Sequence, residues 1–142
     1  MAKINIPEPE KYLHKTKIKV RVTDINYGGH LGNDALLGLI HEARLDFLAQ
    51  EGFSELNCGG AGLIMRNVLI EFKNEAFLHD ELEIQIGISE PSKVGFDLIY
   101  NIIRPKDEKI ISRVLTGMIF FDYEVKKIRP MPTAFHKAYL QE

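Results

Sequence analysis

The sequence predicts an α+β domain in which one long helix lies along a curved, five-stranded antiparallel sheet. Three observations lead to this fold class: an alternating strand pattern comes first, one strongly periodic helical pattern follows, and four further strand patterns complete the chain. The chain has 142 residues, which is enough for a single domain, residues 1–142, to bury a core without disulfides or metal.

The strands are predicted from the alternation of apolar and polar residues. Ile18, Val20 and Val22 alternate with Lys and Arg, so a first strand should lead the chain to Asp24. Turn signals rich in Pro, Gly and Asn separate four further strand segments. These segments are residues 63–73, 81–88, 96–104 and 110–123.

The long helix is predicted to run from Asn33 or Asp34 to about Gln50. Asn33 is a suitable N-cap residue, and Gly52 is a suitable terminator. A second, short helix is expected between residues 133 and 142. The apolar residues of the long helix cover a broad arc, so we expect it to pack against a sheet. They are Leu36, Leu39, Ile40, Ala43, Phe47 and Leu48.

Parts of the predicted sheet are apolar on both faces. This holds for residues 63–65, 98–103 and 118–121. A single helix cannot cover both faces of a sheet and its edges. We therefore expect a homodimer or homotetramer in which sheets of neighbouring copies join edge to edge.

Composition and charge argue against several classes of function. The formal net charge is −2 and the Lys and Arg residues are scattered, so neither nucleic acid nor a membrane surface is an expected partner. No apolar run approaches membrane-spanning length, and residues 1–10 lack the apolar core of a secretion signal. Cys58 is the only cysteine and cannot form an internal disulfide. We expect a cytoplasmic protein without a metal site.

The most informative segment is the polar, glycine-rich stretch from Asp24 to Asn33, between the first strand and the helix. It brings Asp24, Asn26 and His30 close to the start of the helix, where unpaired backbone N–H groups can polarise a carbonyl group or bind an anion. This combination predicts a reaction centre.

The run from Val20 to Asn33, followed by Glu42-Ala43-Arg44, resembles the hotdog-fold thioesterases of the 4-hydroxybenzoyl-CoA thioesterase type. These proteins typically have a strand, Asp-x-Asp, Gly-His-x-x-Asn, and then a helix carrying Glu-Ala-Arg. The resemblance extends over nearly the whole chain. It implies a hotdog fold and hydrolysis of an acyl thioester to a free acid and a thiol. Coenzyme A would enter as part of the substrate, with no separate cofactor, and an acyl carrier protein is the other possible thioester carrier.

The resemblance and the chemistry of thioester hydrolysis suggest catalytic roles for four residues. Asn26 stands where many of these thioesterases carry an Asp, and an amide can hold a water or a carbonyl but cannot accept a proton in turnover. His30 and Glu42 are the candidate general bases, and Asp24 is the third candidate.

Further residues are expected to bind the substrate. Backbone N–H groups around Gly32 and Asn33 would stabilise the oxyanion, and glycines allow the backbone to approach the thioester closely. The acyl pocket should lie between the helix, the strand at residues 63–73 and a neighbouring subunit. The expected substrate-binding residues are Tyr27, Gly28, Gly29, Gly32, Asn33, Met65 and Arg66.

Three of the four catalytic candidates also have a purely structural explanation. His30 can pack at the helix start, Glu42 can pair with a neighbouring side chain on the surface, and Asp24 can fix the loop by accepting backbone hydrogen bonds.

Two other functions remain open. The segment from Asp24 to His30 resembles the Asp-x-Asn-Pro-x-His signature of hotdog enoyl-thioester hydratases, but the Pro is missing and the His comes one residue later. The other alternative is a module that binds acyl-CoA without turnover, which would explain Asn26 in place of an Asp.

Overall fold

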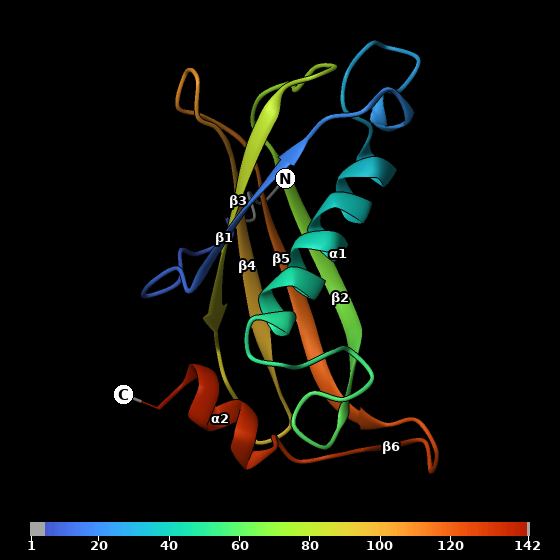
Figure 1. Ribbon diagram of the computed structural model, residues 1–142, viewed down its shortest axis with the longest axis vertical. Helices are drawn as coiled ribbons and strands as arrows, with labels where there is room; N and C mark the ends of the chain where they lie inside the picture. The colour runs from blue at the N-terminus through green and yellow to red at the C-terminus, as the bar shows by residue number, and fades with distance from the viewer. Residues whose placement is uncertain (1–4, 142) are drawn as a thin grey trace.

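The computed structural model describes residues 5–141 (Figure 1). Residue 142, the end of the expected second helix, and residues 1–4 lie outside the described part. The elements, in chain order, are β1 (His14–Lys19), a 3-10 turn (Val22–Asp24), α1 (Asn33–Ala49), β2 (Gly62–Phe72), β3 (Glu81–Ser89), β4 (Gly95–Arg104), β5 (Lys109–Asp122), β6 (Lys127–Ile128) and α2 (Thr133–Tyr139).

The strands form one antiparallel sheet in the order β1-β3-β4-β5-β2, with the two-residue strand β6 paired to β5. Helix α1 lies along one face of this sheet, and α2 lies at its lower end (Figure 1). The predicted α+β class is confirmed, and β6 is an addition to the five predicted strands. Within residues 5–141, no helix is both long and apolar enough to cross a membrane.

The first strand ends earlier than predicted. β1 stops at Lys19, and Val22 lies in the 3-10 turn with 72% of its surface exposed. The carboxylate of Asp24 accepts a hydrogen bond of 2.8 Å from the backbone N–H of Arg21, which holds this turn. The alternating pattern misled the prediction because only Val20 of the last two valines packs in the core.

Helix α1 follows the prediction closely except at its N-cap. Gly32 is the N-cap, with φ −77° and ψ 157°, and Asn33 is the first helical residue, so the prediction of Asn33 as N-cap was wrong. Gly52 has φ 75° and follows the helix end as predicted. All six apolar residues expected to face the sheet are buried.

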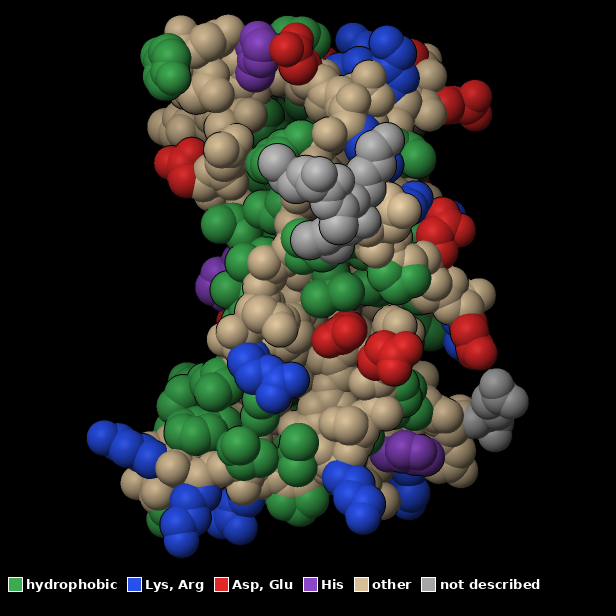
Figure 2. Space-filling view, turned by 180° about the vertical axis from the view of Figure 1, so that it is seen from behind, with side chains coloured by type: hydrophobic (Ala, Val, Ile, Leu, Met, Phe, Trp, Pro, Cys, Tyr) green, Lys and Arg blue, Asp and Glu red, His purple; other side chains and the backbone are tan. Residues whose placement is uncertain are grey.

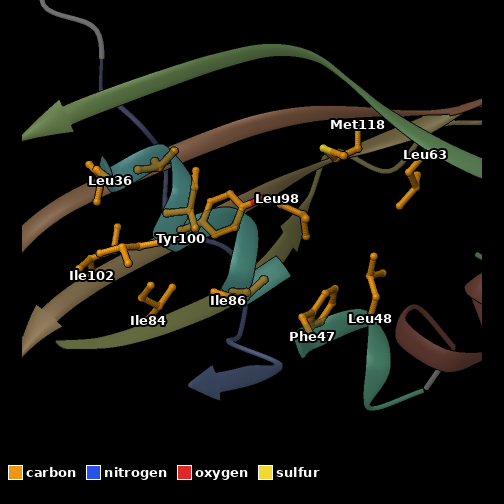
Figure 3. Close-up of a cluster of buried hydrophobic side chains, with 14 of the residues drawn as sticks. Leu36, Phe47, Leu48, Leu63, Ile84, Ile86, Leu98, Tyr100, Ile102 and Met118 are labelled. Carbon is orange, nitrogen blue, oxygen red and sulfur yellow. The ribbon is translucent and has the colours of Figure 1, made fainter. Parts of the chain in front are cut away.

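The core lies between α1 and the sheet. Figure 3 shows Leu36, Phe47 and Leu48 of α1 among side chains from β2, β3, β4 and β5. A charged residue of the Glu-Ala-Arg motif, Arg44, is also buried here. Its Nε donates to Glu55 Oε2 at 2.8 Å, and its Nη1 donates to the Tyr100 hydroxyl at 3.0 Å. These partners offset the free-energy cost of removing the guanidinium from water.

The opposite face of the sheet is crossed by the segment from Ile6 to Leu13. The Ile6 N–H donates to Glu71 Oε1 on β2 at 2.7 Å, and the Leu13 N–H donates to the Ile86 carbonyl on β3 at 2.7 Å. Figure 2 shows this face, on which hydrophobic side chains are visible between polar ones. The segment therefore covers part of the surface that α1 cannot reach.

Two glycine substitutions test this packing, and they should change the free energy of unfolding in opposite directions. A Cβ at Gly87 would lie 2.5 Å from Pro9 Cγ and 2.6 Å from the Lys11 carbonyl oxygen, so Gly87→Ala should lower the free energy of unfolding. Overpacking of this kind costs about 1–3 kcal/mol. A Cβ at Gly38, inside α1, would meet nothing within 4 Å, so Gly38→Ala should raise the free energy of unfolding. The expected gain is about 0.5–1 kcal/mol.

Denaturant unfolding of both variants measures these changes. A Gly87→Ala protein as stable as the wild type would contradict the crossing of the N-terminal segment over β3.

Candidate active site

The polar turn before α1 is organised by the side chain of Asn26. Its Oδ1 accepts hydrogen bonds from the backbone N–H groups of Gly28 at 2.9 Å and His30 at 3.2 Å. The Asn26 N–H in turn donates to the His30 carbonyl at 2.8 Å. Both lone pairs of Oδ1 are occupied, and no described residue accepts from Nδ2. Asn26 can therefore act toward a ligand as a hydrogen-bond donor.

The start of α1 is fixed by two backbone hydrogen bonds. The Leu31 N–H donates to the Ala76 carbonyl at 2.9 Å, and the Gly32 N–H donates to the Asp24 carbonyl at 2.9 Å. The N–H of Gly32 is thus not available to a substrate. The first N–H groups of a helix have no partner within the helix, and no described residue accepts from that of Asn33.

A cavity of about 320 Å³ lies beside this turn. Its walls come from the polar turn, the first part of α1, the end of β2 with the loop that follows it, and the start of β5. Asn26, His30 and Asn33 all line it, so three of the predicted site residues are brought together. The other lining residues are Leu31, Leu36, Phe72, Lys73, Asn74, Glu75, Ala76, Ile111 and Ser112.

The imidazole of His30 lies against the loop between β2 and β3. His30 Nδ1 is 3.2 Å from Glu75 Oε1. The ring of Phe77 meets the imidazole edge-on, with 5.6 Å between ring centres and an angle of 71°. Glu75 was missed by the sequence analysis. Its only local signal is a carboxylate in the turn after a strand, and its closeness to His30 follows from the pairing of Leu31 with Ala76.

Glu42 and Asp24, the other two predicted catalytic residues, do not line this cavity. Glu42 is exposed on α1, on the side toward Arg21, where its charge adds to that of Asp24 in raising the pKa of Arg21. Asp24 is 5% exposed, and both of its carboxylate oxygens accept hydrogen bonds from Arg21. Asp24 therefore fixes the loop by accepting hydrogen bonds, which is the structural alternative that the sequence allowed for it.

Several predicted substrate-binding residues also lie outside the cavity. Tyr27 is fully exposed at the tip of the turn. Gly28 and Gly29 shape that turn through their bonds to Asn26. Met65 and Arg66 lie on the exposed middle of β2, and Arg66 lines a different hollow together with Asp97.

Comparison with known proteins identifies the family. The model of the thioesterase-like superfamily matches residues 20–139. The chain belongs to this superfamily. No curated protein matches the chain.

Solved structures agree with the hotdog fold that the sequence resemblance implies. The chain is similar to a 1,4-dihydroxy-2-naphthoyl-CoA thioesterase from Synechocystis, with 23% identity and a TM-score of 0.79 over 87% of this chain and 93% of that one. A gentisyl-coenzyme A thioesterase gives 20% identity and a TM-score of 0.78 over 89% and 99% of the two chains. A thioesterase superfamily protein from Jannaschia has 17% identity and a TM-score of 0.81, over 94% of this chain and 84% of that one.

The one cysteine is unsuited to act as a nucleophile. Cys58 is completely buried after α1, and this burial raises the pKa of its thiol to about 12. A thiol in this environment stays protonated near neutral pH and reacts slowly.

Native protein should therefore not react with Ellman's reagent at pH 8, whereas denatured protein should release one equivalent of thionitrobenzoate. The absorbance of the released thiolate measures this. Rapid labelling of the native chain would contradict the burial of Cys58.

Proposed function

We propose that the protein is an acyl-CoA thioesterase that hydrolyses an acyl thioester to the free acid and coenzyme A. The observation that carries this proposal is the single cavity shared by Asn26, His30 and the start of α1. These groups match the needs of the reaction, which are an activated water and hydrogen-bond donors for the carbonyl oxygen. Membership of the thioesterase-like superfamily supports the same reaction.

In this mechanism His30 is the general base. The Glu75 carboxylate lies 3.2 Å from Nδ1 and favours the tautomer with the proton on that nitrogen, which leaves the lone pair of Nε2 free to take a proton from water. The hydroxide formed attacks the thioester carbonyl carbon. A carboxylate beside Nδ1 also stabilises the imidazolium that results from proton transfer, as in other pairs of His and an acidic residue.

The developing oxyanion is held by donors from two segments. Asn26 Nδ2 has no described acceptor, and the N–H of Asn33 lies at the positive end of the helix dipole. When the tetrahedral intermediate collapses, the C–S bond breaks and the imidazolium returns its proton to the leaving thiolate. The enzyme is then back in its initial protonation state.

We assign the acidic role to Glu75 and not to Glu42. Glu75 is the carboxylate that both lines the cavity and contacts His30. Glu42 does not line the cavity and lies near Arg21. The Glu-Ala-Arg motif has a different role in this assignment, because its Arg44 ties the helix to the core through Glu55 and Tyr100.

A second copy of the chain completes the site in this proposal, as a homodimer or as part of a homotetramer. β2 is an edge strand, and Met65 and Val68 in its middle are 46% and 39% exposed. Antiparallel pairing of two β2 strands would satisfy their free backbone groups and cover these side chains. Phe72, at the rim of the cavity, lies at the end of the same strand.

Three substitutions test the catalytic assignment. His30→Gln removes the base and should lower kcat/KM for thiol release by ~10²–10⁴. Glu75→Gln keeps the size of the side chain but loses its charge, and should lower kcat by less than the loss of the base itself, because Glu75 acts through His30. Glu42→Gln, the matched carboxylate outside the cavity, should leave kcat/KM nearly unchanged.

The assay follows free thiol and enoyl absorbance together, with a panel of acyl-CoAs and acyl-carrier-protein thioesters. Loss of activity in Glu42→Gln with normal activity in Glu75→Gln would reverse the assignment. An absorbance change without thiol release would indicate a hydratase, and saturable binding without either signal would indicate a binding module.

Asn26→Asp tests the role of the amide. The carboxylate could still accept from Gly28 and His30, but it would lose the donor and place a negative charge beside the oxyanion. We expect kcat to fall by about 10², the usual effect of losing one such donor. A large gain in kcat would mean that the site works best with a carboxylate at position 26, contrary to the proposal.

A further inference from the structure

A buried cation outside the cavity holds the loop that contacts His30. Arg104 ends β4, and only 8% of its side chain is exposed. Its Nη1 donates to the Glu75 carbonyl at 3.1 Å and to Asp80 Oδ2 at 2.8 Å. Its Nε and Nη2 donate to the carboxylate of Asp107 at 3.0 and 2.9 Å. All three acceptors belong to loops at one end of the sheet.

The residues held in this way include those that touch His30. The carbonyl of Glu75 is bound by Arg104, and the carbonyl of Ala76 accepts from the Leu31 N–H. The N–H of Phe77 donates to Asp80 Oδ2 at 2.9 Å, the same oxygen that Arg104 contacts. Each residue from 75 to 77 therefore has one backbone group fixed by a hydrogen bond. The side chains of Glu75 and Phe77, the first and last residues of this segment, contact the His30 imidazole.

Arg104 and the carboxylates and carbonyl that it binds form a clamp on residues 75–77, and its charged groups Arg104 and Asp80 keep their charge at neutral pH. Hydrogen bonds to Asp107 and Asp80 raise the pKa of Arg104 above its usual value. Burial raises the pKa of Asp80, but hydrogen bonds from the Phe77 N–H and from Arg104 outweigh burial and leave it below its usual value. Charge-assisted hydrogen bonds of this kind are roughly twice as strong as neutral ones.

We propose that Arg104 is a positioning residue for His30, which it holds in place through the main chain of residues 75–77. The proposal rests on the proposed role of His30 as base. Arg104 does not line the cavity, so it does not touch the substrate. Its loss should therefore lower kcat while leaving KM nearly unchanged, because a shift of about 1 Å in a reacting group can cost ~10² in rate.

The experiment compares Arg104→Met with Arg104→Lys and Arg113→Met in the full-length protein. Arg113 is an arginine on β5 with 14% of its side chain exposed that contacts Glu8 and, unlike its neighbour Ser112, does not line the cavity. Thermal unfolding first establishes which variants are folded at the assay temperature. The main readout is the ¹H–¹³C signals of the His30 imidazole, identified by their absence in His30→Gln, because the nearby Phe77 ring shifts them.

Arg104→Met should move the His30 signals and lower kcat by roughly tenfold to a hundredfold, within the range of positional effects. Arg104→Lys keeps the positive charge but loses the planar guanidinium with its several donors. It should therefore change the His30 signals and kcat less than Arg104→Met does. Arg113→Met should leave the signals and kcat as in the wild type. If Arg104→Met does not fold, Asp80→Asn gives a second test, because it keeps Arg104 and weakens the contacts of the Asp80 carboxylate with Arg104, the Phe77 N–H and Lys106.

Unchanged His30 signals and kcat in the folded Arg104→Met or Asp80→Asn protein would overturn the positioning role. Equal effects in Arg113→Met would also overturn it, because they would indicate general loosening of the sheet. The imidazole signals do not depend on turnover. A wild-type protein that releases no thiol would therefore refute the proposed function through a different measurement.

Discussion

The candidate site depends on one backbone hydrogen bond, from the Leu31 N–H to the Ala76 carbonyl, which joins two segments far apart in the sequence. It ties the start of α1 to the loop after β2, and the cavity lies between them. His30 and Glu75 belong to separate loops, and this contact holds the two loops side by side. Without this contact the N-terminal end of the helix would face solvent, where its dipole is screened and has little effect on a carbonyl group.

Asn26 illustrates how one substitution can preserve a geometry while changing the chemistry. Its Oδ1 accepts the same two backbone N–H groups that an Asp oxygen could accept, so the turn keeps its shape. The remaining Nδ2 is a donor, whereas an Asp would offer a second acceptor. A proton acceptor for the proposed reaction must therefore lie elsewhere, and His30 follows Asn26 in the same turn and lines the same cavity. The Nδ2 donor would also suit a protein that binds a thioester without hydrolysing it.

The sequence predicted the features that have local signals. The long helix and the strands β2 to β5 were located within a few residues, because periodicity and turn residues report local structure. The polar turn was recognised for the same reason. Glu75 and Arg104 could not be found in this way, since their roles arise from contacts between segments that lie far apart in the sequence. Glu42 was favoured because it belongs to a helix motif, but helix periodicity does not tell which side of α1 faces the cavity.

The central claim is that a thioester carbonyl binds between Asn26 and the start of α1. The most direct measurement is a crystal structure with a ketone analogue of an acyl-CoA, in which a methylene group replaces the sulfur. The account predicts the ketone oxygen within hydrogen-bond distance of Asn26 Nδ2 and the Asn33 N–H, with His30 facing the carbonyl carbon across a water. A ketone bound beside Glu42, or anywhere outside this cavity, would contradict it.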